Sequence, residues 1–453
     1  MSSPNEQRPA AGNFRWVICA LLFFATTFNY LDRQVISYLK EFFCTPAERG
    51  GFGWTNSDFA HLTAAFTAFY AGMTVIAGWV IDKIGTKLGL AFSLIVWSIF
   101  GIANAFAGRL VVMHMVVRSA FGLGEAGNFP ASIKTVAEWF PKRERALATG
   151  IFNSGSNFGA MTAALFVPWC MIHYGDQEGW KLAFVYTGAA GFIWLIFWFW
   201  LYETPARQKR LSPAEYQYIH IDEEAADQDS NGDRGKVSWA RLLVYRQTWA
   251  FFFGKFLTDG IWWFYLFWLP DYLKKQFGMT KHEVMLPTFV VYGIAIIGSV
   301  GGGSIPMALI KRGMQVYQAR MTAMLLIAAC PLAVLSTQYF ANISHFGHYA
   351  STLAVAVICV GAAAHQAWSA NLFTTVSDMF PKKAVGSVTG IGAMAGGLGG
   401  VLVQLLVGSL TDTFSDRPQH AYFIMFIVCA LSYLTAWAVM KALVPRHKPI
   451  TDL

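Results

Sequence analysis

Four charged residues lie inside stretches of sequence that are otherwise apolar enough to span a lipid bilayer. They are Asp32 and Arg33 in the first such stretch, and Arg118 and Glu125 in the fourth. A charge at bilayer depth costs roughly 2.5–3.5 kcal/mol on insertion scales, so it is seldom kept there without a partner and a task. These residue types at this depth predict a pathway for an ion, a proton or a charged solute.

The spacing of these charges groups them on helix faces. Asn29 precedes Asp32 by three residues and Arg33 by four, so all three share one face of a helix. A neutralising contact between Asp32 and Arg33 is the structural alternative to a functional role. Arg118 and Glu125 are almost two turns apart, which places them about 10 Å apart along a common face. The glycines that would let a helix or ligand approach Glu125 closely are Gly122, Gly124 and Gly127.

The composition is that of a polytopic membrane protein. Of the 453 residues, 55% are hydrophobic and only 13% are charged, against about 25% charged residues in soluble domains. A spanning helix needs about 20 mostly apolar residues, and the chain supplies that length many times over. The net charge of +8 does not indicate nucleic acid binding, because the basic residues fall in short loops between apolar segments.

Catalytic and cofactor chemistry find no support in the sequence. The six cysteines are scattered without metal-type or disulfide-type spacing. The run Gly122 to Gly127 matches a dinucleotide-binding glycine pattern only superficially, because no strand precedes it. We therefore expect no enzyme activity, no cofactor, no metal and no catalytic residue.

The apolar segments predict an all-α protein of 12 transmembrane helices in two six-helix bundles. A polar stretch between the bundles is too polar to pack, and we expect a flexible surface crossover with a short helix near 212–221. The segments fall at 15–39, 59–81, 87–107, 110–137, 146–172, 181–202, 248–273, 285–310, 319–339, 349–376, 385–410 and 420–443. The predicted units are a tail at 1–13, a bundle at 14–202, a linker at 203–246, a bundle at 247–443 and a tail at 444–453.

Lysine and arginine are concentrated in alternate loops, in the linker and in the C-terminal tail. Because such loops remain in the cytoplasm, both termini are predicted to be cytoplasmic. Lys274, Lys275 and Lys281 oppose this rule but are outnumbered.

An internal repeat relates the two bundles. Residues 137–151 match residues 377–391 at a constant offset of 240, including Phe140 with Phe380 and Pro141 with Pro381. Two parallel repeats describe a large transporter architecture that binds its substrate near midplane between the halves.

The repeat draws attention to a polar part of the tenth segment. His365 follows Glu125 by the same offset of 240, and Gln366, Ser369 and Asn371 lie nearby. A lone histidine in a span often only bonds two helices together, whereas polar neighbours favour the wall of a cavity. In the seventh segment, Lys255 and Asp259 lie one turn apart, and their role is left open. The aromatic run that follows them, from Trp262 to Trp268, serves packing as readily as binding.

Between the second and third segments, residues 78–87 form the pattern G-x-x-x-D-K-x-G-x-K. Gly78 would allow close helix contact, Gly85 a tight turn, and Asp82 an ion pair with basic residues of the loop that follows the fourth segment. This pattern matches the signature of the major facilitator superfamily; an ordinary basic loop is the alternative. The residues expected to form a cytoplasmic gate are Gly78, Asp82, Lys83, Gly85, Glu138, Arg143 and Asp378.

The chain resembles the anion:cation symporter branch of this superfamily from about Arg15 to Lys441. The branch pattern Asn-Tyr-x-Asp-Arg is present at 29–33, and Arg-x6-Glu is present from Arg118 to Glu125. The stretch 256–270 resembles bacterial hexuronate transporters of the ExuT type, except at Gly260, where that group has proline.

This resemblance implies proton-coupled symport of glucuronate or galacturonate across the bacterial inner membrane by alternating access, with the lipid bilayer as surroundings and a monomer as the working unit. Arg33 would hold the sugar carboxylate and Glu125 would take the proton, with Arg118 as its partner and Asp32 as a second coupling acid. Another sugar acid (galactonate, glucarate or an aldonate), exchange of organic anions or phosphate, and a sensor without turnover are the alternatives. The remaining residues expected to bind substrate are Asn29, Tyr30, Tyr70, Asn157, His365, Trp368, Ser369 and Asn371.

Overall fold

The computed structural model describes residues 12–226, 239–446 and 448–450, and every regular element in them is a helix. This confirms the predicted all-α class. The helices of the N-terminal bundle are α1 (Phe14–Cys44), α2 (Asn56–Ile84), α3 (Thr86–Ala103), α4 (Val111–Glu125), α5 (Asn128–Trp139) and α6 (Lys142–Leu201), with short 3-10 turns η1 (Ala47–Arg49) and η2 (Asn104–Phe106).

Two places in this bundle depart from one helix per apolar segment. The 60 residues of α6 hold two expected segments, and Gly175 divides them with a backbone conformation (φ 73°, ψ 169°) that is not helical. A positive φ is easy only for glycine, which explains a turn at this residue. The single segment 110–137 is instead split into α4 and α5, and α4 ends at Glu125.

The C-terminal bundle repeats this plan with its own interruptions. The expected segment 319–339 is divided between α11, η4 and α12. The elements are α9 (Arg246–Phe277), α10 (Met285–Lys311), α11 (Val316–Ala329), η4 (Cys330–Ser336), α12 (Thr337–Phe340), α13 (Ile343–Phe346), η5 (Gly347–Tyr349), α14 (Ala350–Met379), α15 (Lys382–Thr413) and α16 (Pro418–Leu443).

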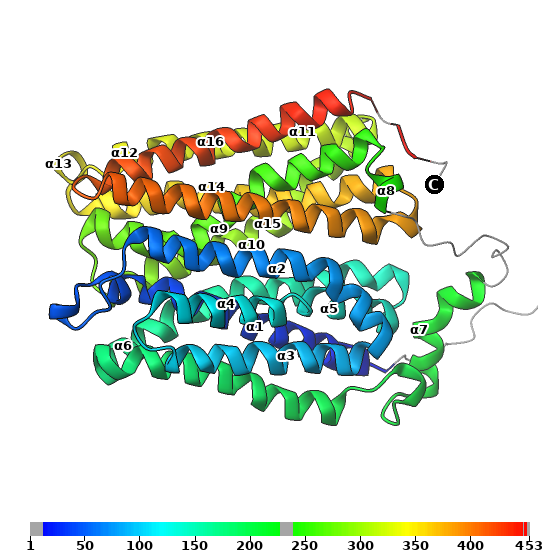
Figure 1. Cartoon of the computed structure of the whole chain (residues 1–453). Coiled ribbons are helices and arrows are strands. Elements are labelled where there is room, and N and C mark those ends of the chain that lie inside the picture. The colour runs from blue at the N-terminus through cyan, green and yellow to red at the C-terminus, as the bar shows by residue number, and fades with distance from the viewer. Residues whose placement is uncertain (1–11, 227–238, 447, 451–453) are drawn as a thin grey trace, which may run out of the picture.

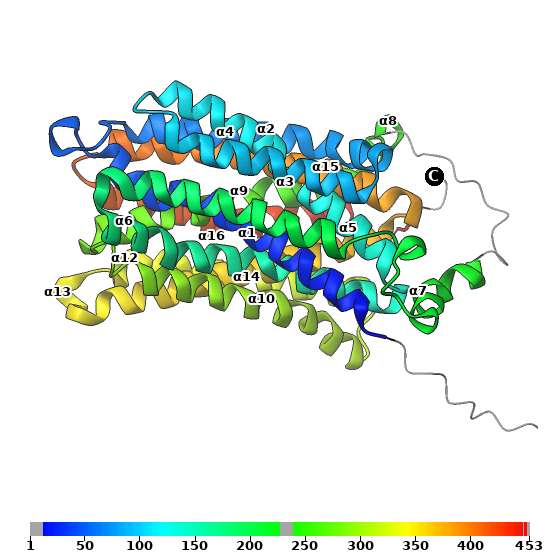
Figure 2. The ribbon, with the colours of Figure 1, turned by 90° about the horizontal axis from the view of Figure 1, so that it is seen from below.

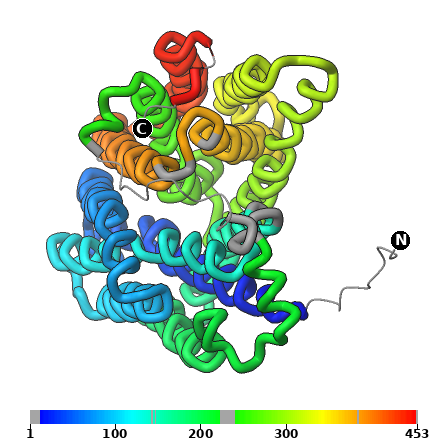
Figure 3. The backbone as a smooth tube through the Cα atoms, turned by 90° about the vertical axis from the view of Figure 1, so that its right-hand side faces the viewer, coloured from blue at the N-terminus to red at the C-terminus, as the bar shows by residue number. Residues whose placement is uncertain are grey.

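The helices of both bundles run side by side along one common direction (Figures 1 and 2). Figure 3, viewed along that direction, separates the N-terminal bundle in blue to green from the C-terminal bundle in green to red. The bundles meet where α2 packs on α15, α6 on α10 and α1 on α9. We call the end with α7 (Pro213–Ala226) and α8 (Trp239–Leu242) the linker end, and the end with α13 the far end (Figure 1).

Glycines of α15 explain how closely α2 approaches it. A Cβ atom added at Gly397 would lie 2.2 Å from the Cβ of Ala71, and one at Gly408 would lie 2.2 Å from the Cβ of Ala60. Small residues facing each other let two helix backbones pack at short range. The interface between the bundles is therefore tight along this seam.

The described part of the linker packs against the N-terminal bundle, contrary to the expectation that it is too polar to do so, and it contains the short helix expected near 212–221. It forms η3 (Pro205–Arg207), α7 (Pro213–Ala226) and α8 (Trp239–Leu242). In α7, Glu215 is buried and accepts hydrogen bonds from the backbone N–H groups of Phe14 and Arg15 at 3.1 Å each. The Arg15 guanidinium also lies 3.0 Å from Glu215 and 2.8 Å from Glu144. A carboxylate at a helix N-terminus is favoured by the helix dipole, so α7 is held against the start of α1. The polar run at 228–233 lies outside the described residues.

The surface of the described chain is apolar where a bilayer would meet it. Nine helical stretches of the described residues are long and apolar enough to cross a membrane by length and composition. Large apolar side chains such as Ile196 (68% exposed) and Val300 (77%) are turned outward. Each of the 12 expected segments overlaps described helical residues, while the number of membrane crossings remains a prediction.

Candidate functional site

A buried ion pair joins α1 to α4. The Nε atom of Arg33 donates to Oε2 of Glu125 at 2.9 Å, and the two side chains are 2% and 0% exposed. A further guanidinium nitrogen of Arg33 lies 3.4 Å from Oδ1 of Asn29, one turn earlier on α1. A single buried charge would be costly, and pairing with the opposite charge offsets part of that cost. Oε1 of Glu125 has no hydrogen-bond partner among the described residues.

Aromatic rings surround the guanidinium of Arg33. Its central carbon lies 4.4 Å from the ring centre of Tyr30, 4.6 Å from that of Tyr70 and 5.1 Å from that of Trp263. Phe66 is also close, at 5.6 Å. A cation over aromatic faces is stabilised by the ring quadrupole, more so away from water. Since Trp263 belongs to α9, the cation of the N-terminal bundle touches the C-terminal bundle directly.

The structure corrects the expected partner of Glu125. The sequence assigned Arg118 to it, but the ion pair is with Arg33. Arg118 lies almost two turns away on the same helix, and it acts on Glu125 electrostatically at longer range. A Cβ atom added at Gly122 would lie 2.8 Å from the carbonyl oxygen of Phe66 in α2, so the predicted close approach at these glycines is confirmed.

Asp32 lies beside a different set of groups from Arg33, its neighbour in the chain. One carboxylate oxygen of Asp32 is directed towards Gly101 of α3, and Arg118 is the cation that acts on it electrostatically. Both Asp32 oxygens, and the Nε and Nη2 atoms of Arg118, lack hydrogen-bond partners among the described residues. The guanidinium of Arg118 lies over Phe121 at 4.9 Å and Phe184 at 5.1 Å. These are two incompletely paired charges within the N-terminal bundle.

In the C-terminal bundle, His365 contacts two aromatic residues. Its Nδ1 atom lies 2.8 Å from the hydroxyl of Tyr433, and its ring stacks on Trp262 with centroids 5.0 Å apart and an angle of 4°. Trp368 is fully buried and packs edge-on against Tyr433. These contacts fix α14 to α9 and α16.

The other residues expected to bind substrate have mixed surroundings. The amide nitrogen of Asn371 donates to the carbonyl oxygens of Gly302 at 2.8 Å and Ala367 at 2.9 Å, so it ties α14 to α10. Ser369 is half-buried on α14. Asn157 is buried on α6, and its Oδ1 has no partner among the described residues.

A second charged pair lies within α9. Nζ of Lys255 is 2.5 Å from Oδ2 of Asp259, and the side chains are 7% and 19% exposed. Both charges belong to one helix, unlike the pair of Arg33 and Glu125, which joins two.

Sequence reasoning missed a set of polar contacts that closes the far end between the bundles. Nζ of Lys40 in α1 lies 2.8 Å from Oδ2 of Asp271 in α9, with both side chains almost fully buried.

Further polar contacts join the bundles at the same end. Lys274 pairs with Glu41 at 2.6 Å, and Asp412 of α15 accepts from the backbone N–H of Ser57 at 2.7 Å. Lys281 pairs with Asp176. The three lysines that opposed the charge rule are thus all engaged here, since Lys275 lies 3.2 Å from Asp271. One signal in the sequence could have revealed these contacts: a lysine, Lys40, and an aspartate, Asp271, lie at the ends of two apolar segments.

The residues of the expected gate lie at the linker end, and the contacts seen there stay within each bundle. Asp82 pairs with Lys134 of α5 at 2.8 Å, a partner that was not expected. The side chain of Lys142, in the stretch expected to supply the partner, lies outside the described residues. Glu138 accepts from Thr86 at 2.7 Å, and Asp378 pairs with Arg320. Lys83 lies over Trp79 at 3.9 Å. The side chain of Arg143 lies outside the described residues.

The two motif glycines behave differently. Gly85 ends α2 with φ 82°, which confirms the tight turn. A Cβ atom added at Gly78 would meet no atom within 4 Å. The expectation of a close helix contact at Gly78 is therefore wrong for this conformation.

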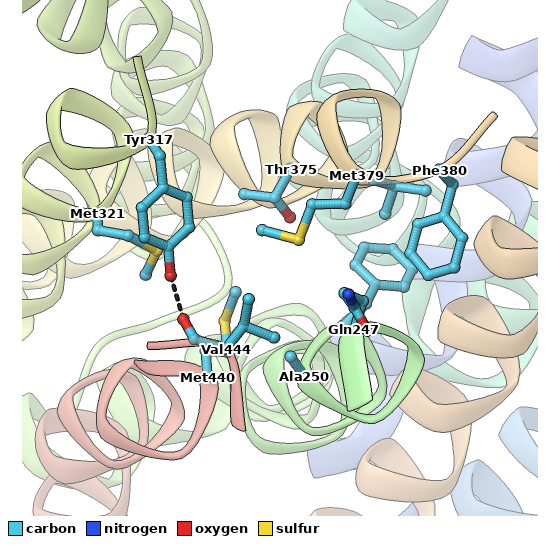
Figure 4. Close-up of a pocket in the computed structure, with 11 residues that line it drawn as sticks. Gln247, Ala250, Tyr317, Met321, Thr375, Met379, Phe380, Met440 and Val444 are labelled. Carbon is cyan, nitrogen blue, oxygen red and sulfur yellow. Dashed lines mark hydrogen bonds between the residues drawn. The ribbon is translucent and has the colours of Figure 1, made fainter. Parts of the chain in front are cut away.

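A small pocket at the linker end of the C-terminal bundle is a poor match for a charged solute. Figure 4 shows it between α9, α11, α14 and α16, with the hydroxyl of Tyr317 donating to the carbonyl oxygen of Val444. Its walls are mainly methionine and other apolar side chains, without an acidic or basic residue: Gln247, Ala250, Phe251, Tyr317, Met321, Thr375, Val376, Met379, Phe380, Met440 and Val444.

The two helical bundles and the match to a transporter family together identify a multi-pass membrane transporter and not an enzyme. The chain belongs to the major facilitator superfamily, whose family model matches residues 22–404.

Known proteins agree with this assignment. Over 428 residues the chain is 31% identical to the hexuronate transporter of Escherichia coli (strain K12), covering 94% of each protein. It is 32% identical over 297 residues to the galacturonate transporter of Dickeya chrysanthemi, covering 65% of this chain and 81% of that relative. The fold is similar to the crystal structure of a bacterial homolog of the human lysosomal transporter Spinster, with a TM-score of 0.73, 16% identity and coverage of 98% and 100%.

Proposed function

We propose that this chain is a proton-coupled symporter that imports a hexuronate, glucuronate or galacturonate, across the bacterial inner membrane. The observation that carries the proposal is the buried pair of Arg33 and Glu125 at the interface between the bundles. The similarity to a hexuronate transporter and a galacturonate transporter supports the substrate class.

Competition for Arg33 couples the proton to the substrate. While Glu125 is ionised, it occupies the guanidinium at 2.9 Å. Protonation of Glu125 removes its charge, so the guanidinium becomes available to a sugar carboxylate, which it can bind through two parallel hydrogen bonds. Arg33 is thus the substrate anchor and Glu125 the proton site. Asp32 and Arg118, which lack full partners nearby, form a second coupling pair.

The surroundings of Arg33 suit the rest of a sugar acid. Tyr30, Tyr70 and Trp263 offer aromatic faces to the apolar side of a sugar ring. Hydroxyl and amide groups of Tyr30, Tyr70 and Asn29 can bond sugar hydroxyls, since all three can donate and accept. His365 and Ser369 act from the opposite bundle.

Alternating access follows from movement of one bundle against the other, with the linker at 203–246 joining them. Lys40 and Asp271 hold the far end closed in this conformation. The charge distribution of the loops assigns the linker end to the cytoplasm, so the far end faces the periplasm. The gate residues around Asp82 then act on the cytoplasmic side, and one chain is the working unit.

The test is the variant Glu125→Gln, reconstituted in proteoliposomes. It mimics a permanently protonated Glu125, so accumulation of labelled glucuronate driven by a pH gradient is expected to be abolished while substrate exchange at equal pH is retained. Glu283→Gln, at an exposed carboxylate near the far end, is the matched control and should keep both activities. Full gradient-driven accumulation by Glu125→Gln would refute the assignment.

Symport of another sugar acid, such as galactonate, glucarate or an aldonate, is the second candidate, because Arg33 recognises only the carboxylate. Competition of unlabelled sugar acids against labelled glucuronate discriminates between them. Phosphate exchange would favour two arginines facing each other from α1 and α9, but α9 offers Lys255 already paired with Asp259.

A further inference from the structure

The pair of Lys255 and Asp259 has no role in the coupling scheme above, although it is buried close to the same interface. Its ammonium and carboxylate are 2.5 Å apart. Asp259 is also packed tightly, because a Cβ atom added at Gly396 of α15 would lie 2.3 Å from its Oδ2 atom. The small residue at 396 thus makes room for the carboxylate.

The pair lies across the interface from Arg33. Trp263, one helical turn after Asp259, places its ring 5.1 Å from the Arg33 guanidinium. Tyr30, whose ring lies 4.4 Å from that guanidinium, is acted on electrostatically by Arg33, Glu125 and Asp259 together. Tyr30 is therefore acted on by charges of both pairs.

The pair of Lys255 and Asp259 also packs against α14. Nζ of Lys255 lies 4.7 Å from the ring centre of Phe373, and one side of α9 is sealed where Trp262 stacks on His365. Asp259 remains 19% exposed and Lys255 only 7%. The carboxylate is thus the more accessible member, and a ligand would meet it first.

A neutral ion pair recognises a different chemical group from a lone cation. Sugar hydroxyls both donate and accept, so they can bond a carboxylate and an ammonium at once. A second carboxylate on the ligand would be repelled by Asp259, which also cancels the attraction of Lys255. A ligand anchored by its carboxylate at Arg33 and extending towards α9 must therefore present an uncharged end.

We propose that Lys255 and Asp259 receive the hydroxyl end of the sugar acid and select monocarboxylates over dicarboxylates of the same carbon skeleton. The inference rests on the proposed function, because it takes Arg33 as the carboxylate anchor. It assigns orientation to the substrate: the charged end faces the N-terminal bundle and the polyhydroxyl end faces the C-terminal bundle.

The test measures equilibrium binding of glucuronate and glucarate to the purified full-length protein, and takes the ratio of the two dissociation constants. Wild-type protein should favour glucuronate. Asp259→Asn exposes the uncompensated charge of Lys255, so the ratio should shift towards glucarate by roughly tenfold or more. The double variant Lys255→Gln with Asp259→Asn removes both charges and should return the ratio towards that of wild type. Asp416→Asn, the same change at an exposed loop residue of the far end, is the matched control.

An unchanged ratio in Asp259→Asn would overturn the inference, whether or not gradient-driven accumulation is also lost. Asp259→Glu keeps the charge and should keep the selectivity, which guards against a general loss of folding. Failure of the proposed function has a separate signature, because wild-type protein would then bind neither glucuronate nor galacturonate.

Discussion

The two bundles follow the same helix plan but use buried charge differently. In the N-terminal bundle, Arg33 and Glu125 reach each other from α1 and α4, while the pair of Lys255 and Asp259 in the C-terminal bundle lies within α9. A pair within one helix keeps its geometry however the helices move. A pair between helices depends on their packing, and here also on Trp263 of the opposite bundle.

The repeat makes this asymmetry explicit. At an offset of 240 residues, Glu125 of the N-terminal bundle is replaced by His365, and Arg118 is replaced by Ile358. Ile358 is fully buried, and His365 is bonded to Tyr433. The comparison teaches that one fold can hold an ion pair between helices in one half and an ion pair within one helix in the other. We propose that the first exchanges a proton and that the second recognises the substrate. Coupling should then depend on the N-terminal bundle, and selectivity on the C-terminal bundle.

The largest effect is expected for Arg33→Ala. Removing a buried cation that bonds a ligand carboxylate costs about 2–5 kcal/mol, which weakens binding roughly 30-fold or more. Isothermal titration of glucuronate to the purified variant measures the loss. Arg49→Ala, at an exposed loop residue of the same bundle, is the control. Unchanged affinity in Arg33→Ala would show that the substrate carboxylate does not bind to the N-terminal bundle at this residue.

A smaller effect is expected for His365→Gln. We propose that His365 bonds a sugar hydroxyl, and losing one hydrogen bond costs about 1 kcal/mol, so glucuronate affinity should fall by roughly fivefold. Coupling should persist, because Glu125, the proposed proton site, lies in the other bundle. The measurement is the ratio of uptake with a pH gradient to uptake without one, compared with wild type. If that ratio falls to one, the hypothesis that coupling depends on the N-terminal bundle alone is refuted.

The smallest effect is expected outside the membrane, at the linker end of the N-terminal bundle. The Lys87 ammonium, 2.7 Å away, holds the pKa of the Glu203 carboxyl below its usual value. A lowered carboxyl pKa stabilises the folded state above the ordinary pKa, and this stabilisation is lost as the pH falls through the lowered value.

Glu203→Gln should therefore cost only about 0.5 kcal/mol near pH 7, because an exposed pair is screened by solvent. The difference from wild type should vanish in acid. Thermal unfolding in detergent at several pH values measures it. A difference that stays constant with pH would show that Glu203 acts by packing and not by charge.

Much of this protein could be predicted from local sequence. The apolar segments, the turn at Gly85 and the buried position of Glu125 follow from hydrophobicity, glycine geometry and residue spacing, which act over a few residues. Gly78 shows the limit: its residue type permits close contact, but whether another helix arrives there depends on the conformation of the whole molecule.

The sequence by itself determined that the charges of the first and fourth apolar segments are buried, because burial there depends on the apolar length around each residue. It did not reveal the buried charges of Lys40, Asp271 and Glu215. Only the tertiary structure decided their partners. Arg33 meets Glu125 across 92 residues of chain, Lys40 meets Asp271 across the two bundles, and Glu215 of the linker meets the start of α1. These contacts arise where helices cross, and the crossings are set by close packing of residues far apart in the sequence, which no local pattern records.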